Sequence, residues 1–173
     1  NDDIYVTGNL GDSYLGLKAL SNKAKFKNKD KLFFVDKYYK PELPLNLTKY
    51  LLKFANSSID VSDGLIDDLA KMINRQSLSF HLFENKIPVS NKLSNLIKKQ
   101  RLNKINLISN GDDYQVLFTA DIKKARIIQK ASKTTGIKIT KIGKIVSGKD
   151  RSLIFDEKGK QIRAKSKGYI HRF

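Results

Sequence analysis

The amino-acid sequence predicts an α+β fold, in which a mixed, mainly antiparallel sheet is covered by helices. Short segments with alternating apolar residues, which is the pattern of strands, occur at 3–8, 57–62, 78–83, 114–119 and 137–146. Longer segments with helical spacing lie between them, but strands and helices do not follow the strict alternation of a parallel-sheet fold. A chain of 173 residues can bury one core, so we expect 1–173 to form a single domain.

The first part of the chain is predicted to contain two strands and four helices. The strands are predicted at 3–8 and 57–62, and the helices at 15–20, 30–40, 45–54 and 64–74. Asp12 or Ser13 is the candidate N-cap of the first helix, because a side-chain oxygen there can accept a backbone N–H. Pro41 ends the second helix, since proline lacks the N–H that a helix interior needs.

The second part is predicted to contain four strands and two helices. The strands are predicted at 78–83, 114–119, 137–146 and 153–155, and the helices at 92–99 and 122–134. Leu78, Phe80 and Leu82 share one face of the first of these strands. Gly136 closes the last helix. The apolar segment 105–109 fits either a helix or a strand.

The composition is strongly basic, with 34 Lys and Arg against 17 Asp and Glu and a formal net charge of +17. Such a charge attracts phosphates and suggests nucleic-acid binding. The lysines are scattered through every segment, however, and the sequence contains no zinc-finger spacing, RNA-recognition motif or long basic run. Nucleic-acid binding is therefore the less favoured function, and small anionic molecules are the favoured ligands.

Residue types that the sequence lacks restrict its chemistry and location. Without cysteine there is no disulfide, thiolate–metal site or cysteine nucleophile. No apolar run is long enough for a membrane helix and the N-terminus carries no signal-peptide pattern, so we expect a cytoplasmic protein. Of the two histidines, His81 lies in a predicted strand and is expected to be structural or exposed, and His171 has no carboxylate beside it. Metal-assisted positioning is thus favoured over covalent catalysis.

The segment 59–65 combines a strand end, an acidic turn and a helix start. Asp60 and Ser62 alternate with apolar residues, and Asp63 is the candidate N-cap of the following helix. Oxygen ligands gathered at such a place suit Mg²⁺, and free N–H groups in the first helical turn suit phosphates. The spacing alone slightly favours a plainer interpretation, in which Asp63 only caps the helix and Asp60 is solvated.

Two further features are candidates for binding. Asp112 and Asp113 form a second acidic turn before the strand at 114–119, and function tends to gather on such loops. Paired carboxylates among so many lysines also form ordinary ion pairs. Tyr169 lies in a glycine-flanked tail, where an aromatic ring either docks on the core or closes over a planar ligand.

Four short motifs follow one another along the chain. They are Ile4-Tyr5-Val6-Thr7-Gly8 with Gly11-Asp12-Ser13, then Ile59-Asp60-Val61-Ser62-Asp63-Gly64-Leu65, then Gly111-Asp112-Asp113-Tyr114, and finally Gly168-Tyr169-Ile170-His171. Their order resembles that of the C-terminal domain of thiamine-monophosphate kinase, and the resemblance spans essentially the whole chain. This family is related to aminoimidazole ribonucleotide synthetase, selenophosphate synthetase and a hydrogenase-maturation protein, and the Ser62-Asp63-Gly64 form points to the thiamine branch.

The resemblance implies an enzyme that transfers the γ-phosphoryl group of ATP to thiamine monophosphate, giving thiamine diphosphate, with Mg²⁺ and without a covalent intermediate. It also implies that Asp60 and Asp63 are Mg²⁺ ligands and that Ser62 contacts ATP. Asp112 and Tyr169 would contact the substrate. These residue types agree with phosphoryl transfer, because its loose transition state requires metal charge and in-line positioning more than a protein base.

The resemblance further implies a partly ferredoxin-like fold and an N-terminal domain, absent from this chain, that carries most ATP and metal ligands and forms a homodimer. The chain begins at Asn1, so we expect a fragment or processed product. Because half of the metal ligands would be missing, we expect this fragment to be inactive alone. Asn110, Gln115, Leu45 and Arg172 depart from the family pattern. Another ATP-dependent enzyme of the same superfamily, or a basic nucleic-acid-binding module, is the alternative function.

Overall fold

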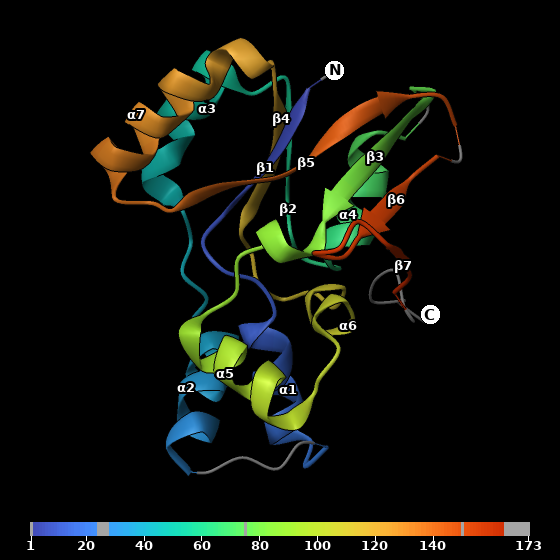
Figure 1. Cartoon of the computed structure of the whole chain (residues 1–173). Helices are drawn as coiled ribbons and strands as arrows, with labels where there is room; N and C mark the ends of the chain where they lie inside the picture. Colours follow the sequence, from blue (N-terminus) through green and yellow to red (C-terminus); the bar gives the residue numbers. More distant parts are fainter. Residues whose placement is uncertain (1, 24–27, 75, 150, 165–173) are drawn as a thin grey trace, which may run out of the picture.

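The centre of the computed structural model, which describes residues 2–23, 28–74, 76–149 and 151–164, is a seven-stranded sheet (Figure 1). The strand order is β2-β4-β1-β5-β3-β6-β7, and all neighbours are antiparallel except β3 and β6. The strands are β1 Asp3–Thr7, β2 Ser57–Asp60, β3 Leu78–Phe83, β4 Val116–Ala120, β5 Ile139–Ser147, β6 Leu153–Phe155 and β7 Gln161–Ile162. The predicted α+β class with a mixed, mainly antiparallel sheet is confirmed.

Seven α-helices accompany the sheet in the part of the chain that the structure describes. They are α1 Asp12–Leu20, α2 Asn28–Tyr39, α3 Thr48–Phe54, α4 Leu65–Met72, α5 Asn91–Gln100, α6 Lys104–Ile108 and α7 Ala125–Thr135. Short 3-10 helices lie at Leu45–Leu47, Glu84–Lys86 and Ile122–Lys124. The ambiguous segment 105–109 is helical because Asn103 caps it, its side-chain oxygen accepting the N–H of Asn106 at 3.0 Å. None of the described helices is long and apolar enough to cross a membrane.

Apolar side chains are buried on both faces of the centre of the sheet. On β1, Ile4 and Val6 belong to the cluster on one face and Tyr5 belongs to the cluster on the other. The first cluster includes residues of α4 and α6, and the second includes residues of α3 and α7, which lie together in Figure 1. The continuous burial of β1 therefore reflects its central position between two helical layers.

A separate group of helices packs at one end of the sheet (Figure 1). Its core is made of side chains from α1, α2, α5 and α6: Leu15, Phe34, Leu93, Leu96 and Leu107. α1 follows β1 after a short turn, so this helical group holds the start of α1 close to the end of the sheet. The first, second and third sequence motifs all lie in this region.

Candidate functional site

Three of the four motifs meet at one end of the sheet for a topological reason. Both β1 and β2 pair with β4 in the antiparallel sense, so β1 and β2 run in the same direction. Their carboxyl ends consequently lie beside the amino end of β4. The turns 8–13, 61–64 and 111–115 extend from those three strand ends and are brought together there.

Backbone hydrogen bonds join the two acidic turns directly. The N–H of Val61 donates to the carbonyl of Gln115 at 2.8 Å, and the N–H of Tyr114 donates to the carbonyl of Val61 at 2.9 Å. The N–H of Asp112 donates to the carbonyl of Ser62, also at 2.9 Å. The acidic turns, 52 residues apart between Asp60 and Asp112 in the printed sequence, therefore form one unit.

Both strands beside this unit are shorter than the sequence predicts. The structure ends β2 at Asp60 and begins β4 at Val116. Asp112 has φ 68° and Tyr114 has φ 50°, and a left-handed backbone cannot continue an extended ladder. Positive φ at a tyrosine is unusual, and such backbone strain is commonly found at functional sites.

Two glycines permit the close approach of these turns. A Cβ atom on Gly111 would lie 1.6 Å from the carbonyl oxygen of Ser62, and one on Gly64 would lie 2.3 Å from that of Ser109. Gly64 also has φ +129°, which disfavours any L side chain. The glycines of the second and third motifs are therefore explained by packing of one turn against the other.

Asp68 holds the second motif from inside the protein. It is 1% exposed, and its Oδ2 atom accepts the backbone N–H groups of Ser62, Asp63 and Gly64, each at 3.0 Å. These donors would otherwise be unsatisfied at the start of α4. The N-cap residue is Gly64, so the prediction that Asp63 caps this helix is wrong. Asp68 thus occupies the N–H groups of the turn that precedes α4, whereas the predicted phosphate contact concerns those of the first helical turn and stays a prediction.

Three carboxylates surround the ammonium group of Lys71. Asp63, Asp67 and Asp68 each offer an oxygen, and these oxygens lie within 4.8 Å of one another. Lys71 forms ion pairs with all three, at 2.8 Å to Asp67 and 3.3 Å to Asp68. Hydrogen bonds to Asp63 and Asp67 are the main causes that raise the pKa of Lys71. Carboxylate oxygens are the type of donor that Mg²⁺ prefers, so the donor type, though not the spacing, suits this ion.

Tyr114 lies among the predicted metal and substrate residues. It is 40% exposed, and its pKa is raised by burial and by the charges of Asp112, Asp60 and Asp63. The pKa of Asp112 is raised in turn by burial and by the charge of Asp63. The structure thus brings Asp60, Asp63 and Asp112 into one electrostatic environment. Tyr114 was part of a sequence motif but was not predicted as a site residue.

The predicted site residues differ in where they lie. Asp60 is exposed at the end of β2, and Ser62 and Asp63 are half-buried in the turn before α4. Asp60 is not in the carboxylate group around Lys71, which instead contains two aspartates of α4. The predicted substrate residue Tyr169 lies outside the described residues. Asp67 and Asp68 could have been identified because they lie one helical turn before Lys71 in the predicted helix.

The first motif joins the same unit through Asp113. This carboxylate is 4% exposed, and it accepts the N–H of Gly11 at 2.7 Å and that of Ser13 at 3.4 Å. Burial raises the pKa of Asp113 to about 8 against the effect of these hydrogen bonds, and the charge of Asp12 raises it further. Gly11, with φ 89°, is the N-cap residue of α1, so neither Asp12 nor Ser13 has the predicted capping role.

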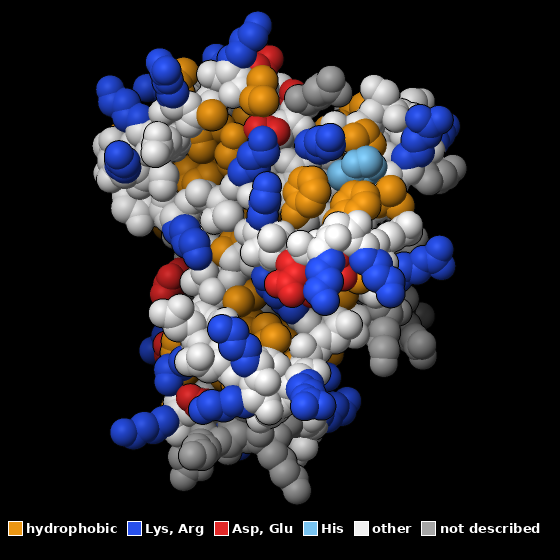
Figure 2. Space-filling model, viewed as in Figure 1, with side chains coloured by type: hydrophobic (Ala, Val, Ile, Leu, Met, Phe, Trp, Pro, Cys, Tyr) orange, Lys and Arg blue, Asp and Glu red, His pale blue; other side chains and the backbone are white. Residues whose placement is uncertain are grey.

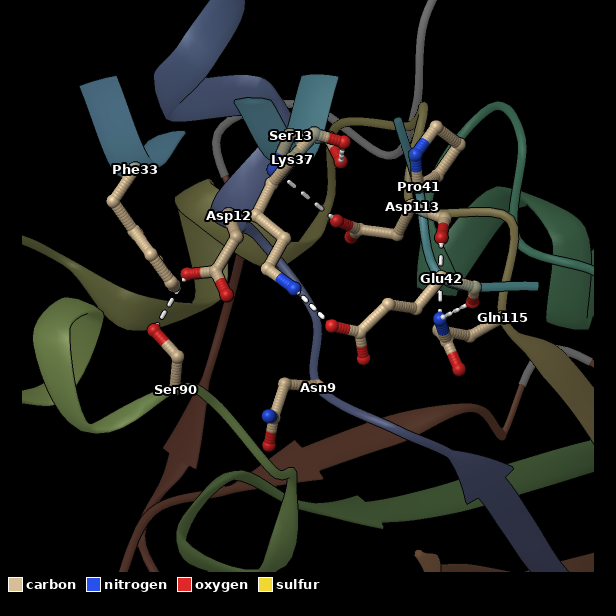
Figure 3. A pocket seen from close by; sticks show the side chains of 10 residues that line it. All are labelled: Asn9, Asp12, Ser13, Phe33, Lys37, Pro41, Glu42, Ser90, Asp113 and Gln115. Atoms are coloured by element: carbon tan, nitrogen blue, oxygen red, sulfur yellow. Dashed lines mark hydrogen bonds and ion pairs between the residues drawn. The ribbon is translucent and has the colours of Figure 1, made fainter. Parts of the chain in front are cut away.

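A small cavity of about 220 Å³ lies beside Asp113 (Figure 3). Its lining comes from the turn after β1 with the start of α1, helix α2 and the segment after it, the N-cap of α5 and the turn before β4: Asn9, Asp12, Ser13, Phe33, Lys37, Pro41, Glu42, Ser90, Asp113 and Gln115. Ser90 donates to Asp12 at 2.7 Å, and Lys37 is paired with Glu42. Burial raises the pKa of Asp12 to about 6, opposed by the hydrogen bond from Ser90.

Gln115, which departs from the family pattern, is explained by its contacts. Its amide nitrogen donates to the backbone carbonyl of Glu42 at 2.7 Å, and its amide oxygen accepts the hydroxyl of Thr7 at 2.8 Å. A glutamate could not donate the first of these bonds when ionised. The neutral side chain therefore suits this buried position beside Asp113.

The basic residues are spread over the whole visible face and also lie beside acidic side chains (Figure 2). Figure 2 shows Lys and Arg side chains over all parts of the visible face, with few Asp and Glu among them. This distribution agrees with solvated lysines spread over the surface and provides a generally positive field for anions.

Comparison with known proteins identifies homologues over almost the whole chain. The thiamine-monophosphate kinase of Buchnera aphidicola subsp. Schizaphis graminum is 35% identical over 172 residues, which is 98% of this chain and 52% of that protein. The chain spans about half the length of the curated relatives that it matches. No family model matches the chain.

Solved structures of similar proteins share the fold. Thiamine-monophosphate kinase from Stenotrophomonas maltophilia K279a aligns with a TM-score of 0.76 and 25% identity, covering 93% of this chain and 51% of that chain. A structure of AaThiL complexed with AMPPCP and TMP aligns with a TM-score of 0.73 and 27% identity, covering 98% of this chain and 51% of that one.

Proposed function

We propose, from the homology of this chain to part of thiamine-monophosphate kinase, that it supplies one half of the site of an ATP-dependent thiamine-phosphate kinase. In this proposal the chain corresponds to the C-terminal domain, and the N-terminal domain supplies the remaining ATP and metal ligands. The reaction is transfer of the γ-phosphoryl group of ATP to thiamine monophosphate.

The observation that carries the proposal is the junction of the two acidic turns. Besides burial, the charges of Asp60, Asp63 and Asp112 raise the pKa of the Tyr114 hydroxyl. Backbone hydrogen bonds join the two turns that carry these residues. If these aspartates were only solvated surface groups, their turns would not need to approach so closely that only glycine fits at positions 64 and 111. The related AaThiL structure is complexed with AMPPCP and TMP, which supports a nucleotide and a phosphorylated acceptor as ligands.

Each predicted residue has a role in this proposal. Asp60 and Asp63 hold Mg²⁺, which, when bound, neutralises the charge that develops on the transferred phosphoryl group. Ser62 contacts ATP through its hydroxyl, because its backbone N–H is bonded to Asp68. Asp112 and Tyr169 bind the substrate.

The rest of the chain positions these groups. Asp68 fixes the backbone from Ser62 to Gly64, and the backbone N–H of Tyr114 bonds the carbonyl of Val61, joining the two turns. No side chain is required to form a covalent bond with phosphorus in this scheme. The chain's contribution is to place negative oxygens and to keep them from rearranging during turnover.

The proposal is tested by supplying the other half of the site. The chain is joined to the N-terminal half of the Buchnera aphidicola relative, and formation of thiamine diphosphate from thiamine monophosphate and ATP is measured with Mg²⁺. We expect product from the joined protein and none from this chain or the N-terminal half alone.

A substrate panel gives the contradicting outcome. If a folded joined protein hydrolyses or transfers phosphate from ATP with other acceptors but not with thiamine monophosphate, the substrate assignment is wrong. Product from this chain alone would contradict the division of the site into two halves. The complete relative serves as the positive control.

A further inference from the structure

We propose that one face of β3 and β6 is a stacking platform for single-stranded nucleic acid, formed by the rings of His81, Phe83 and Phe155. The bases of the strand would stack on these rings, and its phosphates would pair with neighbouring lysines. The proposal is independent of the kinase assignment, because β1 and β5 separate β3 and β6 from β2 and β4, whose ends carry the acidic turns.

The pleat of the two strands places the three rings on the face opposite the first core cluster. Three residues of these strands belong to that cluster: Phe80, Leu82 and Ile154. Successive side chains of a strand point to opposite faces, so the residues next to them share the other face: His81, Phe83 and Phe155. All three are half-buried, and Phe83 is opposite Phe155 where β3 and β6 pair.

The rings contact one another in a continuous row. The ring centroids of His81 and Phe155 are 5.4 Å apart in an edge-to-face arrangement, and those of Phe83 and Phe155 are 6.0 Å apart with 26° between the planes. Neither phenylalanine belongs to a core cluster of the described residues. Figure 1 shows α3 and α7 on the side of β1 and β4, away from β3 and β6. The row is therefore an aromatic surface and not part of a core.

Positive side chains flank this row at both ends. The Nζ atom of Lys86 lies 4.9 Å from the ring centroid of Phe83. Lys144 is exposed on β5 directly opposite His81, and directly opposite residues share a face of the sheet. Figure 2 shows the histidine with apolar side chains beside it and Lys or Arg side chains around them. The segment 141–164 contains seven Lys and Arg against three Asp and Glu, so the charge of this face complements phosphates.

The combination of rings and lysines favours a single strand over other anions. The lysines alone attract any polyanion, since they are spread over the whole surface. The rings distinguish this face, because every base has a flat surface that can stack on an aromatic side chain. In a duplex the bases are stacked on one another and are not free to do so. Three rings with lysines at both ends also offer more contacts than a single nucleotide can use.

The test measures binding of the full chain to a fluorescently labelled thymidine oligonucleotide by fluorescence anisotropy. Its length is about twelve nucleotides, within the usual range of site sizes. An abasic strand of the same length keeps the phosphates but has nothing to stack. Phe155→Ala removes the central ring of the row. Tyr39→Ala is the matched control, because Tyr39 is also an exposed aromatic residue with an aromatic neighbour but lies on α2.

We expect the parent chain to bind the thymidine strand roughly tenfold more tightly than the abasic strand, as stacking of one or two bases would give. Phe155→Ala should lose most of this preference, and Tyr39→Ala should keep it. Lys144→Gln should reduce the slope of log affinity against log salt by roughly 0.7, the effect of one lost phosphate contact. Lys133→Gln on α7 should leave that slope unchanged.

Several results would overturn the proposal. They are equal affinity for the thymidine and abasic strands, an equal loss of preference in Tyr39→Ala, and tighter binding of a duplex than of the thymidine strand. Binding to anionic lipid vesicles without binding to the thymidine strand would assign the face to a membrane surface instead. If Phe155→Ala does not fold, Phe155→Leu replaces it, since leucine keeps most of the apolar volume without a ring. No phosphoryl transfer is measured, so failure here is distinct from failure of the kinase assay.

Discussion

Asp68 and Asp113 are both buried, and both accept backbone N–H groups from the turn before a helix, but their charged neighbours differ. Asp68 accepts three N–H groups and lies 3.3 Å from the ammonium of Lys71. Asp113 accepts two N–H groups and has Asp12 as a charged neighbour. The first turn is thus held by an ion-paired carboxylate, and the second by a carboxyl group that takes up a proton as the pH falls through about 8.

Because of this difference, we expect the two turns to have different roles. The turn held by Asp68 contains Asp63, which belongs to the carboxylate group around Lys71. The turn held by Asp113 changes its charge as the pH passes through about 8, and it borders the cavity rather than that carboxylate group. We therefore expect stability and metal binding to depend on different aspartates.

The largest effect is expected from Asp68→Ala. The substitution leaves one buried and two partly buried N–H groups without their acceptor, and we expect a loss of about 3 kcal/mol in the free energy of unfolding. Urea denaturation measures this loss. Asp67→Ala is the matched control, because Asp67 pairs with the same lysine from a more exposed position and should cost less than about 1 kcal/mol. If Asp68→Ala and Asp67→Ala lost equal free energy of unfolding, the assignment of Asp68 as the residue that holds the turn would be wrong.

A smaller loss is expected from Gly111→Ala, which separates the two acidic turns. Its Cβ would meet the carbonyl of Ser62, and forcing backbone apart at such a contact costs about 2 to 3 kcal/mol. Gly136→Ala is the control: it has positive φ but open space around it, so only strain of about 1 kcal/mol is expected. Equal unfolding free energies for the two variants would contradict the close approach.

The smallest effect concerns Asp113 and pH. Its folded pKa of about 8 lies above the unfolded value, so its contribution to stability is complete below about pH 4 and is lost as the pH rises through 8. Asp113→Asn should remove this dependence. Between pH 7 and 9 the parent chain should lose about 1 kcal/mol more unfolding free energy than the variant.

Asp12 does not interfere with this comparison. Because its pKa is about 6, most of its contribution to the free energy of unfolding is already lost below pH 7. Denaturation series at pH 7 and 9 isolate the contribution of Asp113. Parallel pH curves for the parent and Asp113→Asn would show that Asp113 does not change its proton occupancy between the folded and unfolded states.

Much of the fold could be predicted from local patterns. The alternation of Leu78, Phe80 and Leu82 correctly predicts β3, and the glycine signal at Gly136 correctly ends α7. The pattern of 105–109 could not decide between helix and strand, since five apolar or polar residues are too short for a period. The capping side chain of Asn103, one turn earlier, decided it.

The site was predicted less completely than the fold. Asp60, Ser62 and Asp63 were predicted because strand-end and turn chemistry lie together in sequence, and their roles stay predictions. Asp68, which accepts the backbone N–H groups of Ser62, Asp63 and Gly64, was not predicted. Capping residues were expected before the helix, whereas Asp68 lies within α4. The roles of Asp113 and Gln115 depend on contacts across about 100 residues, which no local pattern contains.

The most direct test of the account measures kcat for thiamine diphosphate formation by the joined protein carrying Asp63→Asn. Asp63 does not cap α4, so we expect the free energy of unfolding to change by less than about 1 kcal/mol. Loss of a carboxylate that would hold Mg²⁺, the ion that neutralises charge on the transferred phosphoryl group, should lower kcat at least about a hundredfold. A retained kcat together with a large loss of stability would contradict the account and assign Asp63 a structural role.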